Sequence, residues 1–264
     1  MKNDKYSLLQ AKDKVCVITG ASSLRSITYA TAELFAAHRA KLVILDLAMN
    51  DQIANDISSN IETQIGKKIE IICLQCDIRN INECDIAIEK TLAHFGTIDC
   101  LVNCAGIVKS ESLLSITESD YDLIMDVNLK GTFNICKSVL KIFTEKQAGV
   151  IVNLASLAAQ RGGGLVGGSH YAASKGGVIS LTRSIAREFA PMNIRANVIC
   201  PAMIETPMLD GLSKDQLANV IAGIPLNRVG KTSELAGTCL FLASELSGFI
   251  TGATIDVNGG MHIH

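Results

Sequence analysis

Short apolar runs rich in β-branched residues alternate with longer segments of helical spacing along almost the whole chain. Seven such runs predict strands, at residues 14–19, 41–46, 69–75, 98–103, 150–154, 194–200 and 254–257. Helical spacing lies between them, in a segment that ends near residue 38 and at residues 81–95, 119–146 and 171–190. Alternating strands and helices indicate βαβ units, and continuously apolar strands indicate a parallel sheet covered on both sides. We therefore expect an α/β fold, a single Rossmann-type doubly wound parallel sheet with helices on both faces.

The bulk composition favours one soluble domain. The chain has 264 residues without a linker, repeat or low-complexity tract, so we expect a single domain at 1–264 with an N-terminal extension at 1–12. Apolar residues make up 48% of the chain and the net charge is -2, which gives no electrostatic case for nucleic acid or a membrane surface as partner. The sequence contains neither a membrane-spanning apolar run nor a signal peptide, and we expect a cytoplasmic location.

The cysteines point to a reducing compartment. Their number, nine, is odd, and most lie in apolar stretches where a free thiol behaves as a small buried hydrophobe. Cys73 and Cys76 form the one Cys-x-x-Cys pair, inside an extended run where residues three apart point to opposite faces. We therefore expect neither a redox pair nor a bound metal ion there, and none elsewhere.

The turn after the first strand is the candidate phosphate site. A tight turn into a helix presents backbone N–H groups, which suits a pyrophosphate, and Gly20 can make that turn. Leu24 and Ser26 occupy the places of the two further glycines of the dinucleotide fingerprint, so an ordinary strand–helix turn remains the alternative. The candidate contacts in this turn are Gly20, Ser22, Ser23, Arg25, Ser26 and Ile27.

Asp46 closes the second strand, twenty-six positions after Gly20. A carboxylate at this place can accept hydrogen bonds from the adenosine ribose and would repel a 2′-phosphate, which favours NAD over NADP. Arg25 could offset the repulsion, so NADP is not excluded. The alternative is a solvated aspartate at a strand end.

Tyr171 and Lys175 begin a predicted long helix and share one face of it. An ammonium beside a phenol lowers the tyrosine pKa, and such a tyrosine can exchange the substrate's proton while hydride moves. Ser156 ends the fifth strand, and its hydroxyl could bind a carbonyl or the forming alkoxide. Tyr-x-x-x-Lys can also arise by chance, and Ser156 could be a turn or cap residue.

The order of these residues resembles the short-chain dehydrogenase/reductase family over nearly the whole chain. The matching residues are Thr19-Gly20, Asp77, Asn103 to Gly106, Asn128, Ser156, Tyr171, Lys175, Pro201, Thr206 and Gly259-Gly260. The resemblance implies a Rossmann-type sheet, a nicotinamide cofactor and usually a homotetramer.

The resemblance also implies roles for the chemical end. Tyr171 corresponds to the catalytic acid/base, and Lys175 to the residue that holds the nicotinamide ribose and lowers the tyrosine pKa. Ser156 corresponds to the ligand of the substrate carbonyl, and Asn128 to the asparagine that holds a water in the proton relay.

Further positions correspond to cofactor contacts. By the same resemblance, Asp77 and Ile78 lie beside the adenine. The contacts with the adenosine ribose and the carboxamide come from Asn103, Ala105, Gly106, Pro201, Ile204 and Thr206.

The glycine turn departs from the common pattern and looks more like the enoyl-thioester reductase branch of the family. That branch places its lysine farther from the tyrosine, whereas the four-residue step from Tyr171 to Lys175 is retained here. We therefore predict a carbonyl reductase. Ala202 also replaces the glycine usual after Pro201, and Cys104 stands where a second asparagine is common.

The segment at 206–228 and the C-terminus look most like 3-oxoacyl-carrier-protein reductases, which suggests a 3-oxoacyl thioester as substrate. Gln147 and Met192 occupy the places of two basic residues for the acidic carrier, so docking of an acyl carrier protein remains open. A catabolic alcohol or 3-hydroxyacyl dehydrogenase is the alternative within the same chemistry. A non-catalytic dinucleotide sensor, or a scaffold without cofactor, is the alternative of another class.

Overall fold

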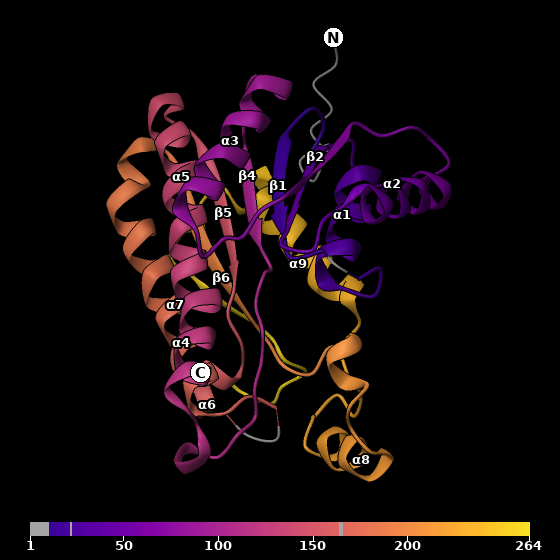
Figure 1. Cartoon of the computed structure of the whole chain (residues 1–264), viewed down its shortest axis with the longest axis vertical. Helices are drawn as coiled ribbons and strands as arrows, with labels where there is room; N and C mark the ends of the chain where they lie inside the picture. Colours follow the sequence, from indigo (N-terminus) through magenta and orange to yellow (C-terminus); the bar gives the residue numbers. More distant parts are fainter. Residues whose placement is uncertain (1–10, 22, 164–165) are drawn as a thin grey trace.

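The computed structural model describes residues 11–21, 23–163 and 166–264, and it contains one parallel sheet between two helical layers (Figure 1). The sheet has seven strands in the order β3-β2-β1-β4-β5-β6-β7, and every neighbouring pair is parallel. The strands are β1 Val15–Thr19, β2 Lys41–Asp46, β3 Ile71–Gln75, β4 Cys100–Asn103, β5 Gly149–Leu154, β6 Ile194–Pro201 and β7 Thr254–Val257. The predicted α/β fold is confirmed.

The helices connect successive strands. They are α1 Ile27–Ala37, α2 Asp51–Ile65, α3 Ile81–Phe95, α4 Glu118–Met125, α5 Gly131–Lys146, α6 Ala158–Arg161, α7 Ser169–Phe189, α8 Lys214–Ala222 and α9 Thr232–Ala243. The prediction for α3 was correct at both ends, and α1 and α7 begin or end within two residues of the predicted limits. Helices α2, α6, α8 and α9 had no counterpart in the sequence analysis.

The long helix predicted at 119–146 is not one regular helix. A π-helical turn at Asp126–Lys130 separates α4 from α5, and the N–H of Gly131 bonds to the carbonyl of Asp126, five residues earlier. Ile124 of α4 packs beside Tyr171 and Ala172, whereas Ile135 of α5 packs beneath the sheet. Because of this turn, α4 and α5 can bury faces that point in different directions.

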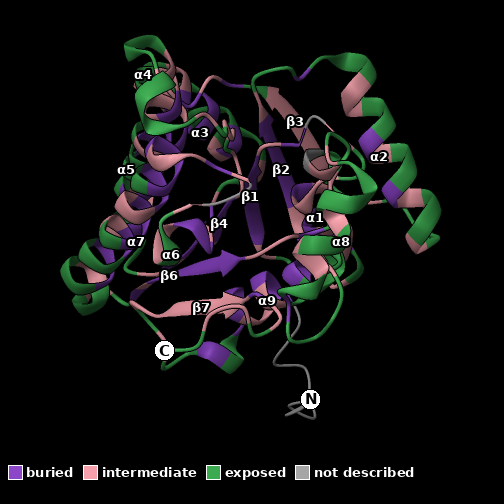
Figure 2. Ribbon diagram, turned by 90° about the horizontal axis from the view of Figure 1, so that it is seen from below, coloured by how far each residue is buried: buried purple, intermediate pink, exposed green. Residues whose placement is uncertain are grey.

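Two apolar cores lie on opposite faces of the sheet. Helices α1, α2 and α9 cover one face, and α3, α5 and α7 cover the other (Figure 1). Neighbouring strand residues divide between the cores, because successive side chains of a strand point to opposite faces: Ile18 joins the first core and Val17 the second. Figure 2 shows the central strands β1, β2, β4 and β6 as mostly buried, the edge strands β3 and β7 as intermediate, and exposed residues on the outer sides of the helices.

The same alternation separates two of the cysteines. Cys73 packs against the first core and Cys76 lies in the second, as expected from their spacing in an extended strand. All nine cysteines are free.

The strand order reverses between β1 and β4, and ligands of doubly wound sheets bind at the carboxyl ends of the strands beside such a reversal. Thr19 and Asn103 are register partners there, and Asn103 is in turn the partner of Asn153. The segments that follow β1, β4 and β5 therefore leave the sheet side by side. Within the described ranges, no helix has the length and apolar character needed to cross a bilayer.

Candidate active site

A cavity of about 530 Å³ opens at the carboxyl ends of these strands. Its lining draws together predicted site residues that are up to 186 positions apart in the chain. They are Gly20, Ser26, Ile27, Gly106, Ser156, Tyr171, Lys175, Pro201, Ile204 and Thr206. Of the four predicted catalytic residues, three line this cavity, and the fourth, Asn128, lies behind it.

Tyr171 is buried at the start of α7, with 8% of its surface exposed. Burial raises the pKa of the Tyr171 phenol, and a hydrogen bond with Ser156 opposes that shift. The expected lowering of this pKa by Lys175 is not found. The Lys175 ammonium lies 6.0 Å from the centre of the tyrosine ring and donates to the Leu154 carbonyl at 2.9 Å rather than to the phenol.

Lys175 is also buried, and burial lowers the pKa of its ammonium to about 8. Gly106 keeps space open beside it, because a Cβ at Gly106 would lie 3.1 Å from both the Lys175 Nζ and the Asn128 Oδ1. Among the described residues the ammonium has one acceptor, the Leu154 carbonyl, so two of its N–H donors are left for a polar ligand.

Asn128 lies within the π-helical turn and is fully buried. Its side-chain oxygen accepts from the Ile107 N–H at 2.9 Å, and its amide donates to the Ile107 carbonyl at 2.9 Å and to the Ser174 hydroxyl at 3.1 Å. The Thr132 hydroxyl donates to the Asn128 carbonyl at 2.6 Å. Asn128 thereby ties the segment after β4 to α7.

Gly20 is required sterically at the turn after β1. Its φ of 88° lies in the left-handed region, and a Cβ there would approach the Ala105 Cα to 2.7 Å. Thr28 closes the turn, because its hydroxyl donates to the Gly20 carbonyl at 2.7 Å. The N-terminus of α1 is thereby held at the cavity.

Ser26 is the N-cap of α1, and its hydroxyl oxygen accepts from the Tyr29 N–H at 3.0 Å. Among the described residues, the Ser26 hydroxyl hydrogen has no acceptor. Ser23 accepts from the Arg25 N–H at 3.1 Å, and Leu24 is 43% exposed, so neither side chain fills the turn. Ser22, a predicted contact, lies outside the described residues.

Arg25 makes an ion pair that the sequence did not indicate. Its guanidinium donates two hydrogen bonds of 2.9 Å to the carboxylate of Asp210. Asp210 follows the short 3-10 helix Pro207–Leu209, whose end residues line the cavity. The pair therefore joins the turn after β1 to the segment at 207–210.

Asp46 and Asp77 lie together at the edge of the sheet beyond this cavity. The Cys76 N–H donates to the Asp46 carbonyl at 3.1 Å, which sets the ends of β2 and β3 side by side. One Asp46 carboxylate oxygen accepts from the Ala48 N–H at 2.8 Å. Asp77 pairs with Arg79 at 2.6 Å, and this hydrogen-bonded guanidinium lowers the pKa of the Asp77 carboxyl.

The remaining predicted cofactor contacts fix the local backbone. The Thr19 hydroxyl donates to Asn103 Oδ1 at 2.5 Å and accepts from the Ala105 N–H at 3.1 Å. Ile78 is buried against Gly131, where a Cβ would lie 2.6 Å from it. These three predicted positions, Ile78, Asn103 and Ala105, lie at the carboxyl edge but outside the cavity lining.

His170, directly before Tyr171, is a buried residue that sequence reasoning missed. It is 2% exposed, and its Nε2 lies 3.6 Å from Glu111 Oε2. Within the described part of the chain, neither imidazole nitrogen forms a hydrogen bond. A histidine beside the tyrosine of the Tyr-x-x-x-Lys motif was visible in the sequence, but its burial depends on the fold.

The chain is similar to known proteins over almost its full length. Residues 20–262 match the family model described as Enoyl-(Acyl carrier protein) reductase. A short-chain type dehydrogenase/reductase of Sinorhizobium fredii, itself uncharacterized, is 41% identical over 256 residues, which is 96% of this chain and 99% of that protein. A 3-oxoacyl-[acyl-carrier-protein] reductase of Thermotoga maritima is 37% identical over 97% of this chain and all of its own.

Solved structures agree with the sequence relatives. The crystal structure of a 3-oxoacyl-[acyl-carrier protein] reductase from Brucella melitensis superposes with a TM-score of 0.88 at 31% identity, covering 97% of this chain and 95% of the other. Fold, residue order and similarity over nearly the full length lead to one assignment. The chain belongs to the short-chain dehydrogenase/reductase family of NAD(P)-dependent oxidoreductases.

Proposed function

We propose that this family member reduces the ketone of a 3-oxoacyl thioester to the secondary alcohol, with Tyr171 as proton donor. The observation that carries the proposal is the meeting of Ser156, Tyr171 and Lys175 at one cavity, where Ser156 lowers the pKa of the Tyr171 phenol against the effect of burial. The 3-oxoacyl-[acyl-carrier-protein] reductases that are 34–37% identical over nearly their whole length support this substrate class. The four-residue step from Tyr171 to Lys175 supports a carbonyl rather than an enoyl substrate.

The residues at the cavity fit a dinucleotide. Gly20 and Gly106 leave space that a Cβ would fill, and the N-terminus of α1 meets the cavity at Ser26 and Ile27. When bound, a nicotinamide cofactor supplies or accepts the hydride. The Ser26 hydroxyl and the first N–H groups of α1 would hold the pyrophosphate, and Lys175 would donate to the nicotinamide ribose.

The protonation states of the cavity suit reduction. The raised pKa of Tyr171 keeps its hydroxyl protonated at neutral pH, so the phenol can give a proton to the carbonyl oxygen. Ser156 would hold that oxygen by a hydrogen bond and orient it. Lys175, with a pKa of about 8, is cationic at neutral pH and would stabilise the phenolate left behind. Asn128 would contribute by holding α7, the helix that carries Tyr171 and Lys175, in position.

For the cofactor, we propose a preference for NAD(H) over NADP(H). Asp46 ends β2 with one carboxylate oxygen already bonded to the Ala48 N–H, and its second oxygen can accept from a ribose hydroxyl. A 2′-phosphate would meet this negative charge. Arg25, the cation that could compensate, is already engaged by Asp210.

We further propose a homotetramer in a reducing, cytoplasmic setting. The tetramer rests on the family resemblance, and the nine free cysteines support the setting. Light scattering of the purified protein gives its mass directly.

The test is a substrate panel read by nicotinamide absorbance. The protein is assayed with acetoacetyl-CoA, crotonyl-CoA, cyclic ketones and simple secondary alcohols, each with NADH or NADPH, or with NAD or NADP for oxidation. We expect the 3-oxoacyl thioester with NADH to be turned over fastest. Oxidation of simple alcohols with no thioester activity would favour the catabolic dehydrogenase instead. Turnover of crotonyl-CoA alone would overturn the carbonyl assignment, and cofactor binding without any turnover would indicate a sensor.

A further inference from the structure

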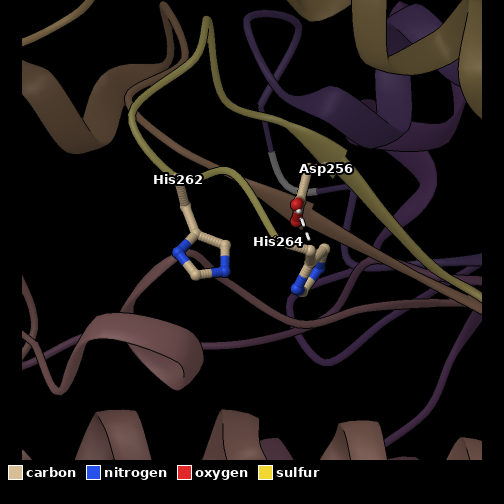
Figure 3. Close-up of side chains that lie close together, drawn as sticks. All are labelled: Asp256, His262 and His264. Atoms are coloured by element: carbon tan, nitrogen blue, oxygen red, sulfur yellow. Dashed lines mark ion pairs between the residues drawn. The ribbon is translucent and has the colours of Figure 1, made fainter.

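Three side chains with metal-ligating atoms meet beside β7, the edge strand of the sheet. Asp256 belongs to β7, and His262 and His264 follow it in the last segment of the chain. One ligand atom from each residue lies within 4.8 Å of the other two. Figure 3 shows the three side chains close together, with the ion pair between Asp256 and His264 as a dashed line.

Their geometry is close to that of a tetrahedral site. Ligand atoms about 2.0–2.1 Å from Zn²⁺ lie roughly 3.3 Å apart. The Asp256 Oδ2 and His264 Nε2 are already 3.1 Å apart, and the centres of the two imidazole rings are separated by 4.8 Å. The remaining adjustment is to bring the His262 nitrogen, which lies within 4.8 Å of the other two ligand atoms, to this spacing.

The segment that carries the histidines is held in place. The Asn258 amide donates to the His262 carbonyl at 3.1 Å, and the Met261 N–H donates to the Asn258 carbonyl at 3.2 Å. Arg161 of α6 donates to the Met261 carbonyl at 3.2 Å. A held segment loses less conformational freedom when an ion binds.

Gln160 of α6 gives a second, independent observation. Its amide donates to Asp256 Oδ1 at 2.8 Å and lies 3.4 Å from His264 Nε2. Its own oxygen is buried, and among the residues described in the structure it has no hydrogen-bond partner. Metal-ligating carboxylates are themselves usually held by such an outer contact, and a free amide oxygen can bind the ion or accept from water on it.

We propose that Asp256, His262 and His264 bind one divalent ion of the late first transition row, such as Zn²⁺, with Gln160 orienting the carboxylate. Two imidazoles and one carboxylate suit Zn²⁺, whereas Mg²⁺ and Ca²⁺ prefer ligand sets made of oxygen alone. The His264 side chain is 60% exposed, which gives the ion a path from solvent.

The site stabilises one wall of the cavity. Arg161 follows Gln160 and Met261 precedes His262 in the sequence, and both residues line the cavity. The ion would join the last segment of the chain to α6 through Asp256 and Gln160. Its role is structural, because none of the three proposed ligands lines the cavity that contains Tyr171.

The experiment uses the full chain without an affinity tag, titrated with ZnCl₂ in a calorimeter and with CoCl₂ in an absorption spectrometer. We expect one ion per chain and a Co²⁺ spectrum without a thiolate charge-transfer band. His262→Ala with His264→Ala should weaken Zn²⁺ binding by more than about 100-fold, and Gln160→Ala by roughly 10-fold, as for outer-shell partners elsewhere. His94→Ala, an exposed histidine on α3, is the matched control and should leave binding unchanged.

Hydrogen exchange gives a readout of the structural role. Amides of residues 258–264 should exchange more slowly with Zn²⁺ in the wild type, and not in the double variant. Asp256→Asn keeps the side-chain shape and serves as the second variant if the double change unfolds the protein. Equal Zn²⁺ affinity in wild type and these variants, a thiolate band with Co²⁺, or no binding at millimolar Zn²⁺ would each overturn the proposal.

Discussion

The two ends of the cavity, the turn after β1 and the start of α7, are built in different ways. At the turn, the groups that face the cavity are backbone amides and short hydroxyl side chains, fixed by local hydrogen bonds such as those of Thr28 and Ser26. At the start of α7, they are the ionisable side chains of Tyr171 and Lys175, both at least nine-tenths buried. Burial raises the pKa of the tyrosine and lowers that of the lysine.

In the proposed function, this difference matches a division of tasks: the turn after β1 binds phosphate, and the start of α7 transfers the proton. A backbone turn can hold a phosphate without any change of protonation, so side-chain changes there are tolerated when the backbone conformation is kept. A buried phenol and ammonium depend on their surroundings for the protonation state in which they act. Substitutions should therefore have large effects at the α7 end and small effects at the turn.

The largest effect is expected for Tyr171→Phe, which removes the hydroxyl and keeps the ring packed. Turnover should fall by about 100-fold or more, because no proton donor remains, while the dissociation constant of NADH stays within about threefold. Stopped-flow turnover and fluorescence titration of NADH measure the two. Tyr121→Phe, at an exposed position on α4, is the control, and equal turnover of the two variants would contradict the proposed role.

Lys175→Met comes next, because one ammonium serves both the ribose and the phenol in the proposed mechanism. Loss of a charged hydrogen bond costs about 1.5–3 kcal/mol, so cofactor affinity should weaken roughly 10- to 100-fold, with a drop in turnover.

The lowered pKa of Lys175 gives this variant a pH signature. The cationic form dominates below about pH 8, so wild-type NADH affinity should fall as the pH rises through that value. The Lys175→Met variant should lack this fall. An identical pH profile in both proteins would show that the ammonium does not meet the cofactor.

A smaller effect, on the order of 1.4 kcal/mol or tenfold, is expected in cofactor choice for Asp46→Ala. The ratio of NADH to NADPH affinity should decrease, since a ribose acceptor and a source of repulsion are lost together. Asp122→Asn, exposed on α4, is the control. A wild type that already prefers NADPH would contradict the assignment of Asp46 and direct attention to Arg25.

The smallest effect is expected for the combined change Leu24→Gly and Ser26→Gly. Leu24 is largely exposed, and glycine replaces a serine N-cap at a cost of a few tenths of a kcal/mol. Closer approach of the backbone at the two glycines should offset the lost Ser26 hydroxyl, so NADH affinity should change less than about threefold in either direction, measured by the same titration. Complete loss of binding would mean that these side chains, and not the backbone of the turn, form the site.

Sequence periodicity was sufficient for the sheet because its strands are continuous apolar runs. It also marks α2, whose four isoleucines at 53, 57, 61 and 65 have a regular four-residue spacing, although no helix was predicted there. Periodicity did not reveal the break at Asp126–Lys130, since a π-helical turn adds a single residue without changing the apolar character of the segment.

The candidate site, too, could be predicted from the sequence only in part. Ser156, Tyr171 and Lys175 could be predicted to meet, because short motifs at strand ends and helix starts converge in a doubly wound fold. The pairing of Arg25 with Asp210 and the meeting of Gln160 with Asp256 could not, since each joins segments about 100 or more positions apart with no local pattern. The direction of the Tyr171 pKa shift was also mispredicted, because burial depends on the assembled fold.

The π-helical turn has a consequence for how such a protein can diversify. One added residue advances a regular helix by about 100°, so the turn sets the rotational phase of α4 independently of that of α5. Mutations in α4 can therefore reshape the contacts beside Tyr171 while α5 keeps its packing under the sheet. Deleting one residue from Asp126–Lys130 would restore a single phase and force one half to expose its apolar side. Deletion of a single residue barely changes the composition, yet here it would be enough to prevent a relative of this protein from folding.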